Sequence, residues 1–389
     1  MLTVREISAA GYRSLKSIRF PVDPLSVFVG ANGVGKTNLY RALELLQSAA
    51  AGTLTRDLAA EGGMESTLWA GKRRVGDKAR VTLMAELADE TGGSVPLGYE
   101  VGVGLVEQYR VDVGVSVATG AAFLLEPQIK SESLVQRTGR RPVTLLSRDG
   151  PHGFVRDADG AKQGFGKSLL ATETALAAVQ NGAAFPELDL TRRTLLEWRF
   201  YHDFRTDAGS RLRRPCLAVA TPTLSSDGSD LAAVFATLAH IRQDTVDLDE
   251  AVGDAFPGAR LVVPEPGREA RFGLIFPDYP KRVFEASELS DGTLRFLALA
   301  GALLAYRLPP FIALNEPETS LHPDLLEPLA RMIVKASERT QVWLVTHSER
   351  LAQAIAHSGR VGPRLVVKRE GATWIDGLKL SGAFDDDED

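Results

Sequence analysis

The chain has 389 residues, of which 44% are hydrophobic and 24% charged, a composition typical of a globular protein with a large core. We find no uncharged apolar run long enough to cross a bilayer and no secretory leader pattern, so we expect a cytoplasmic protein without membrane contact. The net charge of −5 equals that of the acidic segment Asp385–Asp389, so the remaining chain is neutral and a nucleic-acid partner is not excluded.

The first motif along the chain is a glycine-rich loop, GANGVGKT, with the P-loop pattern G-x-x-x-x-G-K-[ST]. The apolar segment 25–29 predicts a buried parallel strand before it, and leucines on one face of 38–46 predict a helix after it. This arrangement directs backbone N–H groups toward a phosphate, while Lys36 offers a charge to the β and γ phosphates and Thr37 a ligand to Mg²⁺. We therefore predict ATP and Mg²⁺ as cofactors, bound by Gly30, Ala31, Asn32, Gly33, Val34, Gly35, Lys36 and Thr37.

In the middle of the chain the predicted secondary structure changes from strands to helices. From about Arg80 to Val155, short β-branched segments between glycine-rich turns predict strands, at 81–87, 99–103 and 109–113. From about Gly166 to Glu250 the periodicity predicts helices, at 168–179, 192–204 and 231–242. No long heptad repeat is present, so we expect this helical part to be compact.

One segment in the helical part, Trp198–Arg205, mixes aromatic and basic residues, and a basic segment, Arg211–Arg214, follows shortly after it. Aromatic stacking and phosphate neutralisation would serve DNA or RNA. The alternative is that Trp198, Tyr201 and Phe204 form the core stripe of a helix whose arginines face solvent. Both interpretations stay open from the sequence, and the second is favoured.

The last third of the chain predicts a second set of buried strands with polar residues at their ends. Segment 311–314 is apolar and is followed by Glu316, whose carboxylate can accept a proton from an attacking water. Segment 342–345 is also apolar and is followed by His347. Before both lies the motif SELSDGT at residues 287–293.

These motifs together resemble the ABC-type ATPases, in the branch that contains SMC, RecF and OLD-type ATPases. The resemblance rests on LSDGT at 289–293, GYRSLK at 11–16 before the P-loop, and EPETSLHP at 316–323. It implies an α/β fold, a P-loop NTPase with an ABC-type head that has a mixed or parallel sheet core, an antiparallel β subdomain and a helical insertion. We expect lobe I at 1–165, the insertion at 166–252, lobe II with the signature, Walker B strand and switch histidine at 253–380, and an acidic tail at 381–389.

The resemblance also implies a homodimer that encloses ATP between its two copies. Ser290 and the backbone around Gly292 would bind the γ-phosphate held by the other copy. Glu316 would be the general base and His347 the switch histidine at the γ-phosphate. A polar residue of the first lobe would position water and Mg²⁺, and Gln180 is the candidate, with an ordinary surface glutamine as the alternative. The implied site residues are Arg13, Gln180, Ser290 and Gly292 for the nucleotide and Glu316 and His347 for catalysis.

One position departs from the family pattern, since Asn315 stands where the family usually has Asp. An amide offers a dipole and a carbonyl lone pair in place of a full negative charge. We expect Mg²⁺ to be held more weakly by Asn315 and more by Thr37 and the phosphates. The departure predicts slow turnover and leaves nucleotide binding intact.

Two functions from different classes fit the sequence. The first is an ATP-dependent clamp or switch in DNA repair or in defence against foreign DNA, acting with a partner such as a separate nuclease. The second is a regulatory ATPase that controls an effector or toxin protein without nucleic-acid contact. Only about thirty residues follow the last predicted helix, so we expect no Toprim nuclease domain, and the single cysteine, Cys216, excludes a paired-cysteine zinc hook.

Overall fold

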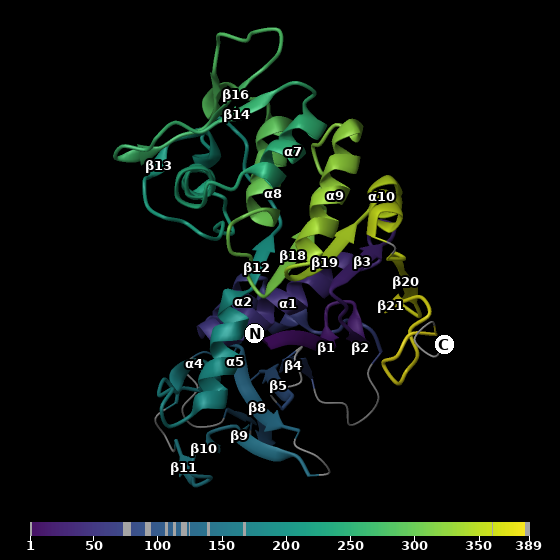
Figure 1. Cartoon of the computed structure of the whole chain (residues 1–389). Helices are drawn as coiled ribbons and strands as arrows, with labels where there is room; N and C mark the ends of the chain where they lie inside the picture. The colour runs from purple at the N-terminus through teal and green to yellow at the C-terminus, as the bar shows by residue number, and fades with distance from the viewer. Residues whose placement is uncertain are drawn as a thin grey trace. The chain divides into compact units, whose positions relative to one another are not determined.

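The computed structural model describes residues 2–72, 79–89, 95–105, 108–111, 114–117, 123, 125–137, 141–165, 169–359 and 361–385. The chain forms two units (Figure 1). Unit 1 consists of Met1–Asp23, Ala31–Trp198 and Leu365–Asp389, and unit 2 of Pro24–Gly30 and Arg199–Arg364. Residues 166–252 lie partly in unit 1 and partly in unit 2, and the expected lobe boundaries stay a prediction. Residues 386–389 of the predicted acidic tail lie outside the described residues.

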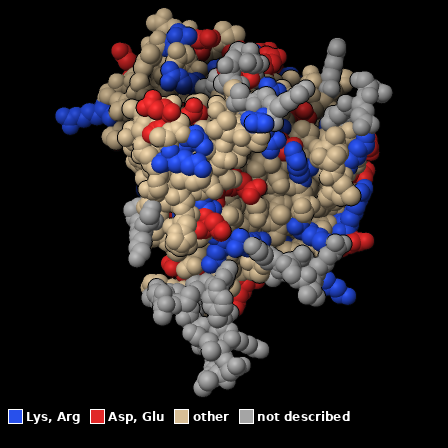
Figure 2. All heavy atoms as spheres, turned by 90° about the horizontal axis from the view of Figure 1, so that it is seen from below, with Lys and Arg blue, Asp and Glu red and all other residues tan. Residues whose placement is uncertain are grey.

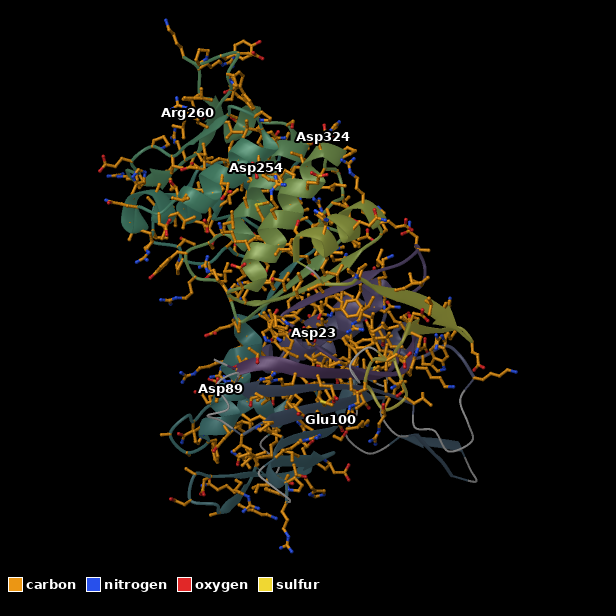
Figure 3. All side chains as sticks on the ribbon, turned by 45° about the vertical axis from the view of Figure 1, so that its right-hand side comes forward. Asp23, Asp89, Glu100, Asp254, Arg260 and Asp324 are labelled. Atoms are coloured by element: carbon orange, nitrogen blue, oxygen red, sulfur yellow. The ribbon has the colours of Figure 1, made fainter. Side chains whose placement is uncertain are left out.

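Unit 1 is built on an eight-stranded antiparallel sheet of order β11-β10-β9-β8-β5-β4-β1-β2. Its strands are β1 (Leu2–Tyr12), β2 (Leu15–Pro21), β4 (Arg80–Asp89), β5 (Leu97–Gly104), β8 (Gln128–Gln136), β9 (Val143–Asp149), β10 (His152–Arg156) and β11 (Lys162–Gly164). In β4 every second side chain from Val81 to Leu87 is buried, as expected for a sheet with one face on the core. Figure 3 labels Asp89 at the end of β4 and Glu100 in β5. The predicted strands at 81–87 and 99–103 are confirmed.

The described residues of unit 1 also form two hairpins and five helices. The hairpins are β6 (Gln108–Val111) with β7 (Gly114–Val117), and β20 (Arg364–Arg369) with β21 (Ala372–Ile375). The predicted strand at 109–113 overlaps β6, and its last two residues lie outside the described part. The helices are α1 (Lys36–Ala51), α2 (Leu54–Ala60), α3 (Gly63–Thr67), α4 (Ala175–Ala178) and α5 (Pro186–Glu197).

Helix α1 packs against β1, β4 and α5 and buries Leu39, Leu43 and Leu46, the face that the sequence predicted. It ends at Gly52, whose φ of 77° is the left-handed conformation common after a helix. The helix that follows the P-loop is therefore fixed against the sheet of unit 1 along its apolar face.

Unit 2 holds four parallel strands in the order β12-β18-β19-β3, which are β12 (Arg199–Tyr201), β18 (Phe311–Asn315), β19 (Gln341–Thr346) and β3 (Leu25–Val29). All residues of β18 and β19 are buried, which explains their continuous apolar sequence. The register pairs Tyr201 with Leu314, Asn315 with Val345, and Thr346 with Val29. The carboxyl ends of the four strands therefore meet at one edge of the sheet.

Helices and small strands make up the rest of unit 2. The helices are α6 (Leu231–Ala236), the π-helix η3 (Thr237–Arg242), α7 (Val246–Ala255), α8 (Asp291–Leu303), α9 (Leu326–Ser337) and α10 (Glu349–Gly359), with short 3-10 turns η2 (Arg211–Arg213), η4 (Ala286–Glu288) and η5 (Pro323–Leu325). The small strands are β13 (Cys216–Leu217), β14 (Arg260–Val262), β15 (Glu269–Ala270), β16 (Gly273–Ile275) and β17 (Phe284–Glu285). Helices α7, α8 and α9 pack side by side (Figure 1). Across the residues that the structure describes, no helix combines the length and apolarity that a bilayer crossing needs.

The predicted helix at 192–204 is wrong beyond residue 197. Helix α5 ends at Glu197, and Arg199–Tyr201 form β12 instead, because an aromatic segment gains more from pairing beside the buried strand β18 than from one more helical turn. The aromatic residues Trp198, Tyr201 and Phe204 are at most 3% exposed. They are buried, as the favoured interpretation required, but they do not form one helical stripe, since Trp198 caps α5, Tyr201 ends β12 and Phe204 follows it. The predicted helix at 168–179 is likewise reduced to α4, with residue 168 outside the described part.

Candidate functional site

The P-loop connects the end of β3 to α1 through two left-handed glycines, Gly33 at φ 82° and Gly35 at φ 101°. A Cβ on Gly33 would meet no atom within 4 Å, so the loop faces open space there. A Cβ on Gly35 would lie 1.9 Å from Thr373 Oγ1 and 2.5 Å from Ser14 Oγ. Glycine is therefore required at position 35 both for its backbone conformation and for this close approach.

Lys36 begins α1 and lies across the P-loop. Its side chain is buried, and Nζ donates to the carbonyl of Ala31, 2.9 Å away. The first turn of a helix leaves N–H groups without intrahelical partners, and Thr37 in this turn is exposed. The loop thus offers an ammonium group, the N–H groups of a first helical turn and open space beside Gly33. These features fit the phosphates of a nucleotide, and the Thr37 hydroxyl fits a Mg²⁺ ligand.

Arg13, a sequence-predicted nucleotide contact, is held in an ion pair inside unit 1. Its guanidinium donates to Glu61 Oε2 at 2.8 Å. The same carboxylate accepts from Tyr12 Oη at 2.7 Å and from Arg41 Nη2 at 2.5 Å. Arg13 also has a left-handed backbone, with φ 46°. Its role at the nucleotide stays a prediction.

Gln180 follows the short helix α4 on an exposed turn. Its side-chain amide donates to the carbonyl of Ala177 at 3.0 Å, within its own turn. This contact favours the alternative of an ordinary surface glutamine.

A different polar residue, His202, lies at the sheet edge of unit 2. It follows β12 directly, and its Nδ1 is hydrogen-bonded to Nδ2 of Asn315, the last residue of β18. Asn315 is 2% exposed, and within the described part of the chain its Oδ1 is buried without a hydrogen bond. A buried oxygen left open in this way fits a contact to Mg²⁺ or to its water shell. The sequence missed His202 because its segment was assigned to a helix; a polar residue at the end of a short aromatic strand was the available signal.

The structure brings Glu316 and His347 together in unit 2. Glu316 follows β18 with a left-handed φ of 48°, and its N–H donates to the carbonyl of Val345 at 2.8 Å. His347 follows β19, and its Nδ1 lies 3.6 Å from Glu316 Oε1. A non-glycine residue in this backbone region is strained, and such strain often marks functional positions. The Glu316 side chain is 32% exposed, so water reaches its carboxylate.

Glu318 ties the loop after β18 to the loop after β19. Its Oε1 accepts from Thr346 Oγ1 at 2.5 Å and from the N–H groups of His347 and Ser348 at 3.1 and 3.3 Å. The same oxygen lies 3.2 Å from His347 Nδ1. Glu318 thus positions His347, a role that the sequence did not indicate although this is the second carboxylate of the E-P-E motif.

Ser290 caps the N-terminus of α8, where its Oγ accepts from the N–H of Thr293 at 3.2 Å. Ser290 and Gly292 line a pocket of about 670 Å³ in unit 2, together with residues 320–325, which include η5. Figure 3 labels Asp324 in η5. A helix N-terminus that opens into a pocket favours an anionic ligand.

Arg213 supports the signature loop from within unit 2. It donates to the carbonyls of Leu289 at 2.7 Å and Ser287 at 3.1 Å, and to Asp291 Oδ1 at 2.6 Å. Its Nε donates to the carbonyl of Thr206 at 2.7 Å. Its side chain is only 14% exposed, so this member of the predicted basic segment Arg211–Arg214 holds protein groups instead of facing nucleic acid.

Residues 25–352 match the protein family described as "AAA domain, putative AbiEii toxin, Type IV TA system". The chain belongs to this family of AAA domains, and its fold is similar to that of SMC head domains. One similar solved structure is an SMC head bound to the C-terminal winged-helix domain of ScpA, at 14% identity, covering 97% of this chain and 99% of that chain with a TM-score of 0.55. Another is an SMC head with an extended coiled coil from Pyrococcus furiosus, bound to the C-terminal domain of ScpA, at 14% identity, 98% and 97% coverage and a TM-score of 0.51. No curated protein matches the chain. The predicted α/β fold is confirmed.

Proposed function

We propose that the protein binds ATP and Mg²⁺, hydrolyses ATP, and forms a homodimer with ATP between its copies. The observation that carries the proposal is the row of residues at the carboxyl ends of the four parallel strands. His202, Glu316 and His347 follow β12, β18 and β19, Asn315 is the last residue of β18, and Gly30, which begins the P-loop, follows β3. Open parallel sheets bind their ligands at this edge.

The proposal assigns a chemical role to the P-loop residues and to the residues at the ends of the parallel strands. Lys36 and the N–H groups of the P-loop bind the β and γ phosphates. Mg²⁺, when bound, neutralises charge on the phosphate oxygens. Glu316 accepts the proton of the attacking water. His347 keeps Nδ1 toward the carboxylates of Glu316 and Glu318, which leaves Nε2 for the γ-phosphate. Asn315, held by His202, would offer its Oδ1 to Mg²⁺ or to its water shell.

The signature residues would act on the ATP of the second copy. Ser290 and Gly292 open into a pocket of about 670 Å³, and Arg213 holds their loop in shape. Gly292 also lies close to the loop after β18, since an added Cβ would lie 3.1 Å from the carbonyl oxygen of Ser320. This helix N-terminus supplies its dipole and N–H groups to a γ-phosphate brought by the partner.

We place this ATPase with a partner protein in DNA repair or in defence against foreign DNA. The two SMC heads named above were solved with another protein bound, which supports a protein partner here. A second candidate is a regulatory ATPase that controls an effector or toxin without contact to nucleic acid, and the family description, which names a toxin, favours it. On the face shown in Figure 2, basic and acidic side chains are interspersed among the described residues, so this face adds no support for DNA binding.

The steady-state rate of ATP hydrolysis tests the proposal. The wild type should hydrolyse ATP slowly with Mg²⁺. Lys36→Ala removes the ammonium group proposed to bind the phosphates, so it should lower both ATP affinity and rate. Unchanged ATP binding by Lys36→Ala in a direct titration would contradict the P-loop assignment. Adding duplex or single-stranded DNA at fixed salt separates the two candidates, because only the first predicts that DNA changes the rate.

A further inference from the structure

A hairpin far along the chain contacts the P-loop within unit 1. Strands β20 and β21 are joined by a tight turn at Glu370 and Gly371, with φ values of 49° and 83°. The turn places Thr373 of β21, which is 1% exposed, beside the turn between β1 and β2. There the N–H of Thr373 donates to the carbonyl of Ser14 at 2.9 Å.

The hydroxyl groups of Ser14 and Thr373 link two points of the P-loop region. Thr373 Oγ1 donates to the carbonyl of Val34 at 2.7 Å, and Asn38 Nδ2 donates to Ser14 Oγ at 2.6 Å. The two hydroxyl oxygens lie 2.6 Å apart. Each hydroxyl has one proton, and that of Thr373 is used on Val34, so Ser14 must donate to Thr373. The hydrogen bonds therefore run in one direction, from Asn38 through Ser14 and Thr373 to Val34.

This chain of hydrogen bonds spans Gly35, Lys36 and Thr37, three of the residues proposed to contact phosphate. It is anchored on the loop at Val34 and on the first turn of α1 at Asn38. A peptide group is planar and trans, so holding the Val34 carbonyl toward Thr373 points the N–H of Gly35 to the opposite side. The side chains of Thr373 and Ser14 fill the space where a Cβ at position 35 would lie.

We propose that Thr373 and Ser14 are positioning residues that hold the P-loop in its phosphate-binding shape before the nucleotide arrives. The inference rests on the proposed ATP binding and extends it to a segment more than three hundred residues from the loop. Preorganising a binding loop raises affinity because the ligand does not have to order it. The C-terminal hairpin is thereby part of the nucleotide site, although it touches no phosphate.

The test compares ATP affinity among variants by direct titration, with the thermal stability of each nucleotide-free protein measured in parallel. Thr373→Val keeps the side-chain volume and removes the hydroxyl, so the affinity should fall about tenfold, the effect of one lost buried hydrogen bond. Thr373→Ser restores the hydroxyl and should bind within about twofold of wild type. Thr191→Val is the matched control, because Thr191 is a fully buried residue of α5 whose hydroxyl donates to the carbonyl of Glu187 at 2.8 Å. It should lose stability without losing affinity.

Wild-type affinity in folded Thr373→Val would overturn the proposal, because a purely structural role lowers stability alone. If Thr373→Val does not fold, Ser14→Ala breaks the same chain of hydrogen bonds, and unchanged affinity in that variant would overturn it equally. Wild-type protein that binds no ATP would instead contradict the proposed function itself. A tenfold loss in Thr373→Val with recovery in Thr373→Ser supports the proposal.

Discussion

His202 and Asn315 form a hydrogen-bonded pair at the carboxyl ends of two adjacent parallel strands, β12 and β18. Because the amide nitrogen of Asn315 is used by His202 Nδ1, the amide oxygen points away from the imidazole. That oxygen is buried and, among the described residues, accepts no hydrogen bond. The pair therefore presents an oxygen at the position where the resemblance predicts an Asp carboxylate.

The first prediction concerns Asn315→Asp. A carboxylate holds Mg²⁺ more strongly than an amide, so the variant should need less Mg²⁺ for half-maximal hydrolysis, with ATP affinity in the absence of metal nearly unchanged. Steady-state rates titrated with Mg²⁺ for both proteins measure this. The maximal rate is a poorer readout, because the introduced carboxylate also adds negative charge beside the proposed general base, Glu316. An equal or higher Mg²⁺ requirement would show that Asn315 does not serve the metal.

Removing the His202 side chain should weaken the Mg²⁺ site, the opposite of the effect expected for Asn315→Asp. His202→Ala frees the amide of Asn315 to rotate, so the Mg²⁺ requirement should rise and kcat should fall about tenfold, the effect of one lost hydrogen bond. His202→Gln, whose side-chain oxygen can accept the same hydrogen bond, should recover part of the loss. The ATP affinity measured without metal should stay constant in both variants. If His202→Ala and wild type need the same Mg²⁺ concentration for half-maximal hydrolysis, His202 does not act at the metal site.

Arg213→Ala should uncouple nucleotide binding from dimerisation. The change takes hydrogen bonds from the carbonyls of Leu289 and Ser287 beside Ser290, so the signature loop loses its shape while the P-loop is untouched. We expect ATP affinity of the monomer to stay near wild type and ATP-driven dimerisation to weaken by about tenfold or more. Arg211→Ala is the control, because the Arg211 side chain is 76% exposed in the same segment. Dimerisation at wild-type strength in Arg213→Ala would contradict this role.

The buried carboxylate of Glu132 in unit 1 makes stability depend on pH. Burial raises the pKa of Glu132, while hydrogen bonds from Leu176, Ala175 and Tyr99 and the charge of Arg148 hold back part of that rise. The folded state therefore binds more protons than the unfolded state once the pH exceeds the ordinary pKa of a glutamate, and stability falls as the pH rises toward the folded value. Glu132→Gln lacks this dependence.

Chemical denaturation at about pH 5 and about pH 8 checks the prediction for Glu132. The difference in unfolding free energy between wild type and Glu132→Gln should shift in favour of the variant at the higher pH. A difference that is constant with pH, or that shifts toward the wild type, would show that Glu132 is ionised in both states.

The parts of the site that the sequence predicted are those encoded by neighbouring residues. The P-loop is a continuous motif between a strand and a helix, and Glu316 and His347 each follow an apolar strand, so their meeting at one sheet edge follows from parallel pairing. What escaped prediction depends on contacts distant in sequence. His202 lies in a segment whose aromatic spacing fits a helix, and pairing with β18 overrides it. The contacts of Thr373 and Arg213 join segments 339 and 78 residues apart, and no local pattern records them.

The central claim, that ATP holds two copies together before hydrolysis separates them, is tested most directly by sedimentation of Glu316→Gln. The substitution removes the proton acceptor and keeps the side-chain volume, so the ATP-bound dimer should accumulate. With saturating ATP and Mg²⁺ the variant should sediment as a dimer, and with ADP as a monomer. A monomer in saturating ATP and Mg²⁺ would contradict the account.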